Sequence, residues 1–115
     1  MIEWQRTLEL REEVGAEVFS EIFDIFLEES KSTLEQLSLE DQATLKAQIH
    51  FMKGSSLNVG FRGLAELCEQ YLSHWESHVP QDMISALRSH FEASTKEFYE
   101  KLSSKIDELT PQTVP

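Results

Sequence analysis

Apolar residues recur along this chain every three or four positions, the spacing at which side chains share one face of an α-helix. No stretch alternates apolar and polar residues as a half-buried β-strand does. The clearest series has steps of 4, 3, 4 and 3 residues and consists of Leu45, Ile49, Met52, Ser56 and Val59. This is the spacing of a helix seam in a bundle, so the pattern predicts an all-α protein.

Glycine, proline and polar turn residues divide the pattern into helical segments. Gly15 and Gly60 follow two of them and are expected to adopt the left-handed conformation that ends many helices. Ser38 with Asp41 three residues later matches a capping box, and Pro80 suits the first turn of the last helix. The first two expected helices span residues 3–13 and 16–37. The third begins at Ser38 and stops at Gly60, and the fourth follows Gly60 and fades at residues 78–79. The fifth begins at Pro80 and ends at about residue 109.

Four of these segments are amphipathic and are joined by short connections, so each buries its apolar stripe best against antiparallel neighbours. The expected fold is an antiparallel up-down four-helix bundle, with residues 3–13 as a short N-terminal capping helix. The 115 residues fit one domain, which we place at residues 1–109. Residues 110–115 are expected to form a frayed C-terminal tail.

The chain is strongly acidic, with 21 Asp or Glu against 10 Lys or Arg and a formal net charge of −11. It lacks the basic face that binds phosphate backbones or anionic membranes, so we expect neither nucleic acid nor membrane partners. Its start does not resemble a signal peptide, and no apolar run reaches the length of a membrane span, about 18 residues. These features favour a cytoplasmic protein.

The single cysteine, Cys68, permits no internal disulfide and no cysteine cluster for zinc, as is usual in a reducing compartment. Its place on an apolar helix face indicates a small core residue rather than a nucleophile. The chain is too short to hold a nucleotide-binding domain and a second domain. We therefore expect no independent ATP-using enzyme and no resident cofactor.

The acidic charge is unevenly distributed. Residues 1–41 carry 12 acidic and 3 basic side chains, and residues 66–115 carry 9 acidic and 4 basic ones. The 24 residues between them contain no Asp or Glu, and their charged residues are Lys46, Lys53 and Arg62. Such a window tolerates an anion, although a buried helix would also be poor in charge.

One histidine in this window has neighbours suited to chemistry. His50 follows the seam residue Ile49 and so lies at the flank of the buried stripe, on a face shared with Lys46, Lys53 and Gly54. A mid-helix glycine costs about 1 kcal/mol relative to alanine, so its missing side chain needs an explanation. A nucleophilic ring supplies one: Gly54 leaves an open approach, and Lys53 neutralises an arriving phosphoryl group that carboxylates would repel. The alternative is an exposed histidine beside a packing glycine.

Other candidate sites are weaker. His74 and His78 are four residues apart and could share a metal ion, but the nearby Glu76 lies on a different face, so we expect no metal site. Ser55 and Ser56 lie mid-helix, without the strained turn and oxyanion hole that a serine hydrolase needs.

Two motifs in this region are distinctive: His50-Phe51-Met52-Lys53-Gly54-Ser55-Ser56 and, after Gly60, Leu64-Ala65-Glu66-Leu67-Cys68. They resemble the histidine phosphotransfer (HPt) domain family, whose pattern is His-x-Leu-Lys-Gly-Ser-Ser or Ala, then Gly, then Leu and Cys at these spacings. The predicted helix layout extends the resemblance over nearly the whole chain.

The resemblance implies a role for each matching residue. His50 corresponds to the phosphorylated histidine, and Lys53 to the lysine that faces the phosphoryl oxygens. Gly54 corresponds to the small residue that leaves the ring accessible. Ser55 corresponds to the serine beside it, and Gly60 to the turn glycine of the helical hairpin.

The implied function is that of a phosphoryl carrier in a His–Asp phosphorelay. The chain would accept phosphate from the aspartyl phosphate of one receiver domain and pass it to another, without ATP binding or kinase activity of its own. Partners would be receiver domains of response regulators or hybrid histidine kinases, Mg²⁺ would belong to the receiver, and the carrier would act as a monomer. The alternative is a helical interaction or regulatory domain that transfers no phosphoryl group.

The docking surface is expected around His50, with Phe51, Leu57 and Phe61 as exposed apolar contacts and Lys46 as a supporting cation. Phe61 departs from the family pattern, which has a small residue after the turn glycine.

A second departure concerns the ring itself. Leu72 lies where many family members have Glu or Gln, which bonds the far ring nitrogen and fixes the tautomer. Leucine cannot make that bond. Gln70, Ser73 or water therefore substitutes, or the ring is less firmly oriented.

Overall fold

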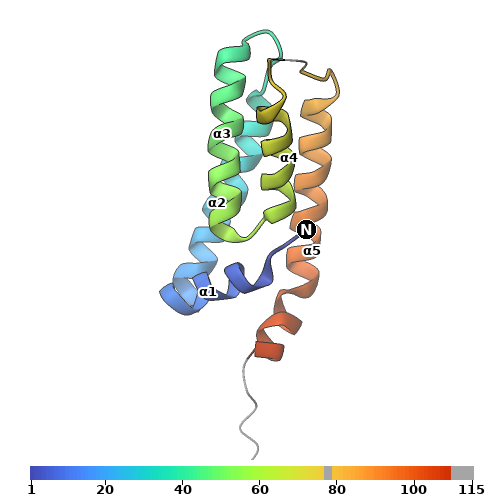
Figure 1. Cartoon of the computed structure of the whole chain (residues 1–115). Helices are drawn as coiled ribbons and strands as arrows, with labels where there is room; N and C mark the ends of the chain where they lie inside the picture. The colour runs from blue at the N-terminus through green and yellow to red at the C-terminus, as the bar shows by residue number, and fades with distance from the viewer. Residues whose placement is uncertain (77–78, 110–115) are drawn as a thin grey trace, which may run out of the picture.

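The computed structural model describes residues 1–76 and 79–109, which contain helices and no strand. The helices are α1 (Trp4–Val14), α2 (Ala16–Gln36), α3 (Gln42–Val59), α4 (Arg62–Ser73) and α5 (Met83–Leu109). Helices α2 to α5 run alternately up and down as a bundle, and α1 lies across its lower end (Figure 1). The predicted all-α bundle with an N-terminal capping helix is confirmed. No helix in the described ranges is both long enough and apolar enough to cross a membrane.

The core is built from the periodic apolar positions of the sequence. All five seam residues of α3 are buried, with exposed fractions of 2% or less. Leu64 and Cys68 of α4 and Leu87 of α5 are fully buried as well. Each large apolar side chain removed from water contributes about 1.5–3 kcal/mol to folding. Helix α3 is therefore held firmly along its length, and residues next to the seam project in fixed directions.

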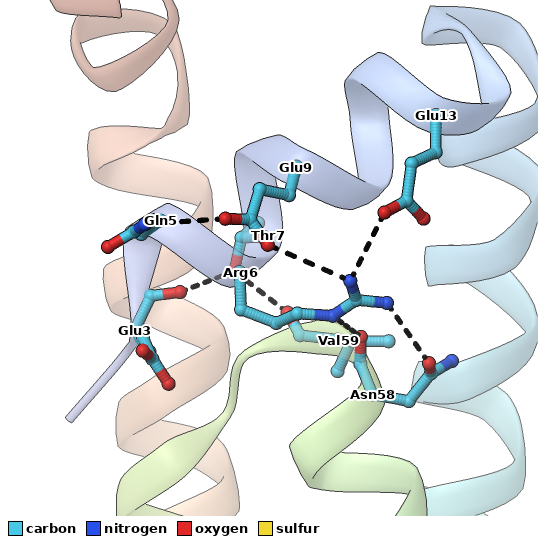
Figure 2. A network of polar contacts seen from close by, with 8 residues as sticks. All are labelled: Glu3, Gln5, Arg6, Thr7, Glu9, Glu13, Asn58 and Val59. Atoms are coloured by element: carbon cyan, nitrogen blue, oxygen red, sulfur yellow. Dashed lines mark hydrogen bonds and ion pairs between the residues drawn. The ribbon is translucent and has the colours of Figure 1, made fainter.

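Helix α1 is fastened to the turn between α3 and α4. The buried Thr7 hydroxyl donates to the Val59 carbonyl at 2.8 Å (Figure 2), and the Glu3 N–H donates to the Gly60 carbonyl at 2.7 Å. Gly60 has φ 88° and ψ 12°, the left-handed conformation predicted from the sequence. A side chain there would collide with the Thr7 hydroxyl and lie 2.8 Å from the Glu3 carbonyl oxygen. Glycine is thus needed both for the turn and for the close approach of α1.

A charged side chain completes this junction. The Arg6 guanidinium extends from α1 to the end of α3, where it donates to the Asn58 backbone carbonyl at 3.0 Å and to the Asn58 side chain at 3.3 Å (Figure 2). It also lies 3.6 Å from a Glu13 carboxylate oxygen of its own helix. The capping helix is thereby tied to the α3–α4 hairpin by both buried and exposed groups.

The predicted helix start at Ser38 is wrong. Helix α3 begins at Gln42, and the Asp41 carboxylate caps it by accepting the Thr44 N–H at 3.1 Å and the Thr44 hydroxyl at 2.7 Å. These bonds lower the pKa of Asp41. The Ser38 hydroxyl instead accepts the Glu40 N–H in the preceding turn, because Ser38 is too far from the first free N–H groups of α3.

The ends of the other helices also differ from expectation in places. Helix α5 begins at Met83, whose N–H donates to the Pro80 carbonyl, so Pro80 lies in the preceding turn rather than inside the helix. Helix α4 ends at Ser73, before the predicted fade at 78–79. Gly15 ends α1 with a φ of 87° but a ψ of 158°, outside the predicted left-handed helical region. Residues 77–78 and the predicted tail at 110–115 lie outside the described residues.

Candidate functional site

His50 projects from the solvent side of α3. Its neighbour Ile49 is fully buried at the seam, whereas the His50 side chain is exposed. One residue along a helix turns the side chain by about 100°, which accounts for the contrast. No hydrogen bond to the imidazole ring occurs within residues 1–76 and 79–109. The ring is thus held on a rigid helix with its nitrogens free of protein partners there.

Open space lies beside the ring, one turn along the helix. Gly54 has ordinary helical geometry, and a Cβ built on it would have no described atom within 4 Å apart from its chain neighbours and the nearby backbone of its own helix. The glycine is therefore required neither by the backbone nor by a neighbouring group of the chain. The absence of a side chain at Gly54 does, however, leave the approach to His50 unobstructed.

The ammonium group of Lys53 already forms an ion pair with a carboxylate. Its Nζ lies 2.6 Å from Oε2 of Glu69, which projects from α4 across the hairpin. The sequence window around His50 contains no acidic residue, but the folded site does, so the expectation of a carboxylate-free site is wrong. A signal for Glu69 was present: a hairpin turning at Gly60 that places His50 opposite Leu72 also places Lys53 opposite residue 69.

Two hydrogen bonds fix the Glu69 carboxylate. One oxygen accepts from Lys53 and the other accepts from the Ser73 hydroxyl at 2.9 Å. These bonds, with the charge of Lys53 and a smaller contribution from the charge of His50, lower the pKa of Glu69. Glu69 is thus ionised at neutral pH and lies within electrostatic range of the ring.

Two other predicted site residues flank His50 on α3. Lys46 is half-buried, and no carboxylate of the described residues forms an ion pair with it. The Ser55 hydroxyl donates to the Phe51 carbonyl at 2.8 Å, one turn back along the same helix. Lys46 is therefore the uncommitted cation of the site, while Ser55 is engaged with its own backbone.

Apolar side chains beside His50 face solvent, as predicted for two of three residues. Phe51 is 60% exposed and Leu57 is 48% exposed. Phe51 also borders a hollow between α2 and α3, whose floor includes Phe26 and Met52. Polar and charged side chains, among them Glu29 and Thr33, line the same hollow.

The third residue, Phe61, is not exposed, and the prediction that it belongs to the docking surface is wrong. Phe61 has no exposed surface and packs edge-on against Phe26, with ring centroids 4.9 Å apart. Its ring also contacts Phe23 and Phe98, so it joins the turn of the hairpin to α2 and α5. Of the three residues, Phe51 and Leu57 are therefore the exposed apolar side chains near His50.

The structure limits which side chains of α4 could hydrogen-bond to the His50 ring and fix its orientation. Leu72 is half-buried and packs against the core, so it makes no polar contact with His50. The Ser73 hydroxyl donates to Glu69 rather than to the imidazole. The Gln70 side chain forms no hydrogen bond among the described residues, and the Gln70 backbone carbonyl lies 2.9 Å from Nδ1 of His74. The last turn of α4 thus faces His50 without a side chain hydrogen-bonded to it.

The remaining candidate residues, the possible metal ligands and Cys68, form no metal-binding or nucleophilic site in the part of the chain that the structure describes. Within the described ranges, no three His, Cys, Asp or Glu side chains are grouped as metal ligands, and His78 lies outside those ranges. Cys68 is buried in the core, as predicted, and burial raises the pKa of its thiol to about 12. A thiol with that pKa is not a nucleophile at neutral pH.

The arrangement suits attack by an unblocked imidazole on an electrophile brought by a second molecule. The chain supplies a nucleophile, two cations and an open approach, but no metal cluster and no general base hydrogen-bonded to the ring in its described part.

Comparison with known families agrees with this geometry. The family model described as Hpt domain matches residues 21–97, which include α3, α4 and the His50 site. Neither a curated protein nor a solved structure matches the chain. Hpt domains are helical phosphotransfer carriers of phosphorelays that interact with receiver domains and are not kinases. Because the match covers about two thirds of the chain, this protein belongs to the Hpt domain family.

Proposed function

We propose that this protein carries a phosphoryl group on His50 between two receiver domains of a His–Asp phosphorelay. The observation that carries the proposal is the exposed ring of His50 on a firmly packed helix, with open space at Gly54 and a lysine one turn away. A histidine that was merely solvated would not need the vacant position beside it.

The transfer step requires little from this chain. The lone pair of a neutral ring nitrogen attacks phosphorus, a nitrogen–phosphorus bond forms, and the bond to the aspartyl oxygen breaks. The receiver carboxylate leaves with the electron pair, and the ring keeps the proton on its other nitrogen until solvent removes it. Lys53 and Lys46 offset the charge of the phosphoryl oxygens, while Mg²⁺ is supplied by the receiver.

The receiver is proposed to dock over α2 and α3 around His50. Phe51 and Leu57 provide exposed apolar surface there. Helix α3 contributes no Asp or Glu to this surface, whereas Glu29 of α2 lines the hollow beside Phe51, so α3 is the part of the surface that repels the acidic pocket of a receiver least. Contacts of this kind are small and transient, as a carrier that exchanges partners requires.

A labelling experiment tests the proposal. The protein is incubated with receiver domains that have been phosphorylated by acetyl phosphate and Mg²⁺, and the label is tested for acid lability and base stability. We expect label on the wild type and on His74→Gln, which removes another exposed histidine, and background label on His50→Gln. Equal label on His50→Gln, or no label on the wild type with any receiver, would overturn the proposal.

A further inference from the structure

The ammonium group of Lys53, which would stabilise an incoming phosphoryl group, is already paired with the carboxylate of Glu69. The two charged atoms are 2.6 Å apart, and the side chains are 32% and 51% exposed. Exposed pairs of this kind contribute little to stability, so folding alone gives a weak reason for it. It is also geometrically firm, because Ser73 holds the second carboxylate oxygen at 2.9 Å.

The two anions compete for one ammonium group. Lys53 lies three residues from His50 on the same face of α3, within reach of a phosphoryl group on the ring. In the free protein its ammonium donates to Glu69. A phosphoryl group can use Lys53 fully only after that bond is broken or shared. No carboxylate of residues 1–76 and 79–109 pairs with Lys46.

We propose that Glu69 is a positioning residue that withholds Lys53 from the phosphoryl group and so limits how readily His50 is phosphorylated. The inference deepens the proposed function and rests on it. A carrier has to release its phosphate as well as accept it. A lysine shared with Glu69 stabilises the bound phosphoryl group less than a free lysine would, which favours onward transfer.

The test uses phosphoramidate as the phosphoryl donor, so that no partner protein affects the result. The ring nitrogen attacks phosphorus, the phosphorus–nitrogen bond of the donor breaks, and ammonia leaves. The rate at His50 is followed by ³¹P NMR as the difference between each protein and its His50→Gln counterpart. Glu69→Gln retains the shape and the acceptor for Ser73, and we expect it to raise this rate about two- to fivefold.

The matched control is Glu66→Gln. Glu66 is exposed on the same helix, one turn from Glu69, and pairs with Arg62 at 3.0 Å instead of with Lys53. It therefore changes the net charge by the same amount without releasing Lys53. We expect its rate to equal that of the wild type. A rise equal to that of Glu69→Gln would mean that overall charge, not Lys53, controls the reaction, and would overturn the inference.

A second background tests whether Glu69 acts through Lys53. In Lys53→Ala, the Glu69→Gln change should leave the rate unaltered, because no ammonium remains to be released. The same two- to fivefold gain in that background would show direct repulsion by Glu69 and contradict the proposal. If Glu69→Gln does not raise the rate when Lys53 is present, that result would contradict the proposal as well.

A readout that needs no phosphorylation separates this inference from the proposed function. The ¹⁵Nζ resonance of Lys53 should shift in Glu69→Gln and not in Glu66→Gln. An unshifted Lys53 resonance in Glu69→Gln would overturn the inference alone. A wild type that no donor labels would overturn the proposed function, whatever Lys53 does.

Discussion

Gly54 is a residue whose cost the chain itself does not explain. It has helical geometry, and a methyl group in its place would contact no described group beyond its chain neighbours and the nearby backbone of its own helix. The local physical chemistry therefore favours alanine at this position. An unfavourable residue retained beside an exposed His50 indicates that the vacancy serves an encounter with another molecule.

Two substitutions separate the structural and functional effects of Gly54. We expect Gly54→Ala to raise the free energy of unfolding by about 0.5–1 kcal/mol in urea denaturation. Gly54→Gln should also not destabilise the helix, but its longer side chain should reduce transfer from a phosphorylated receiver at least tenfold by blocking the ring. Undiminished transfer with Gly54→Gln would remove this explanation for the glycine.

Phe61 shows why a single residue in a turn was mispredicted. Helical periodicity assigns a face to residues inside a helix, but Phe61 precedes α4 and follows the left-handed Gly60. Its direction is set by the aromatic rings of Phe23 and Phe26, which are distant in sequence. Lys53 and Gly54 follow His50 by three and four residues within α3, so helical geometry alone assigns them to its face.

At the scale of whole elements, the junction between α1 and the α3–α4 turn depends on one buried hydroxyl. Thr7 has no exposed surface, and its hydroxyl satisfies the Val59 carbonyl next to Gly60. Loss of that bond leaves a buried carbonyl without its partner, which costs more than a surface hydrogen bond.

We expect Thr7→Val, which keeps the shape and removes the hydroxyl, to lower the free energy of unfolding by about 1–2 kcal/mol. The control is Thr95→Val, because the Thr95 hydroxyl donates to the Phe91 carbonyl within its own helix and joins no two elements. Urea denaturation of both variants measures the difference. Equal losses would mean that the Thr7 bond does not fasten α1 to the hairpin.

Helix existence and packing faces were predictable, whereas helix ends were less so. The seam of α3 is regular over its whole length, and all its residues are buried as predicted. The first residue of α3 could not be predicted, because both Ser38 and Asp41 are good capping residues and only the geometry of the turn selects Asp41. Boundaries depend on a few local bonds, while faces are determined by many residues together.

At the scale of the whole molecule, the charges around His50 depend on the fold and not only on their order along the sequence. The sequence separates the acidic residues from the region of His50, yet the hairpin returns Glu69 to within 2.6 Å of Lys53. Linear charge patterns describe neighbours along a helix but not those contributed by the next helix. The register of the hairpin supplies that information once its turn is located at Gly60.

The net charge of −11 should also affect stability. Many carboxylates on a small bundle repel one another, and added salt screens this repulsion. We expect the Tm to rise by about 2–5 °C between low salt and 0.3 M NaCl at pH 7. Calorimetry measures the shift. A Tm that falls with salt would show that surface ion pairs such as Lys53–Glu69 outweigh the general repulsion.

The position of His50 opposite the last turn of α4 has an electrostatic consequence of its own. The peptide dipoles of a helix sum to about half a unit of negative charge at its C-terminal end, and α4 ends at Ser73. In the proposed relay, the phosphorylated ring lies within electrostatic range of Glu69 in this part of α4, and side-chain substitution does not remove the backbone potential there. The hairpin architecture itself would then disfavour long storage of phosphate and favour its passage to the next protein.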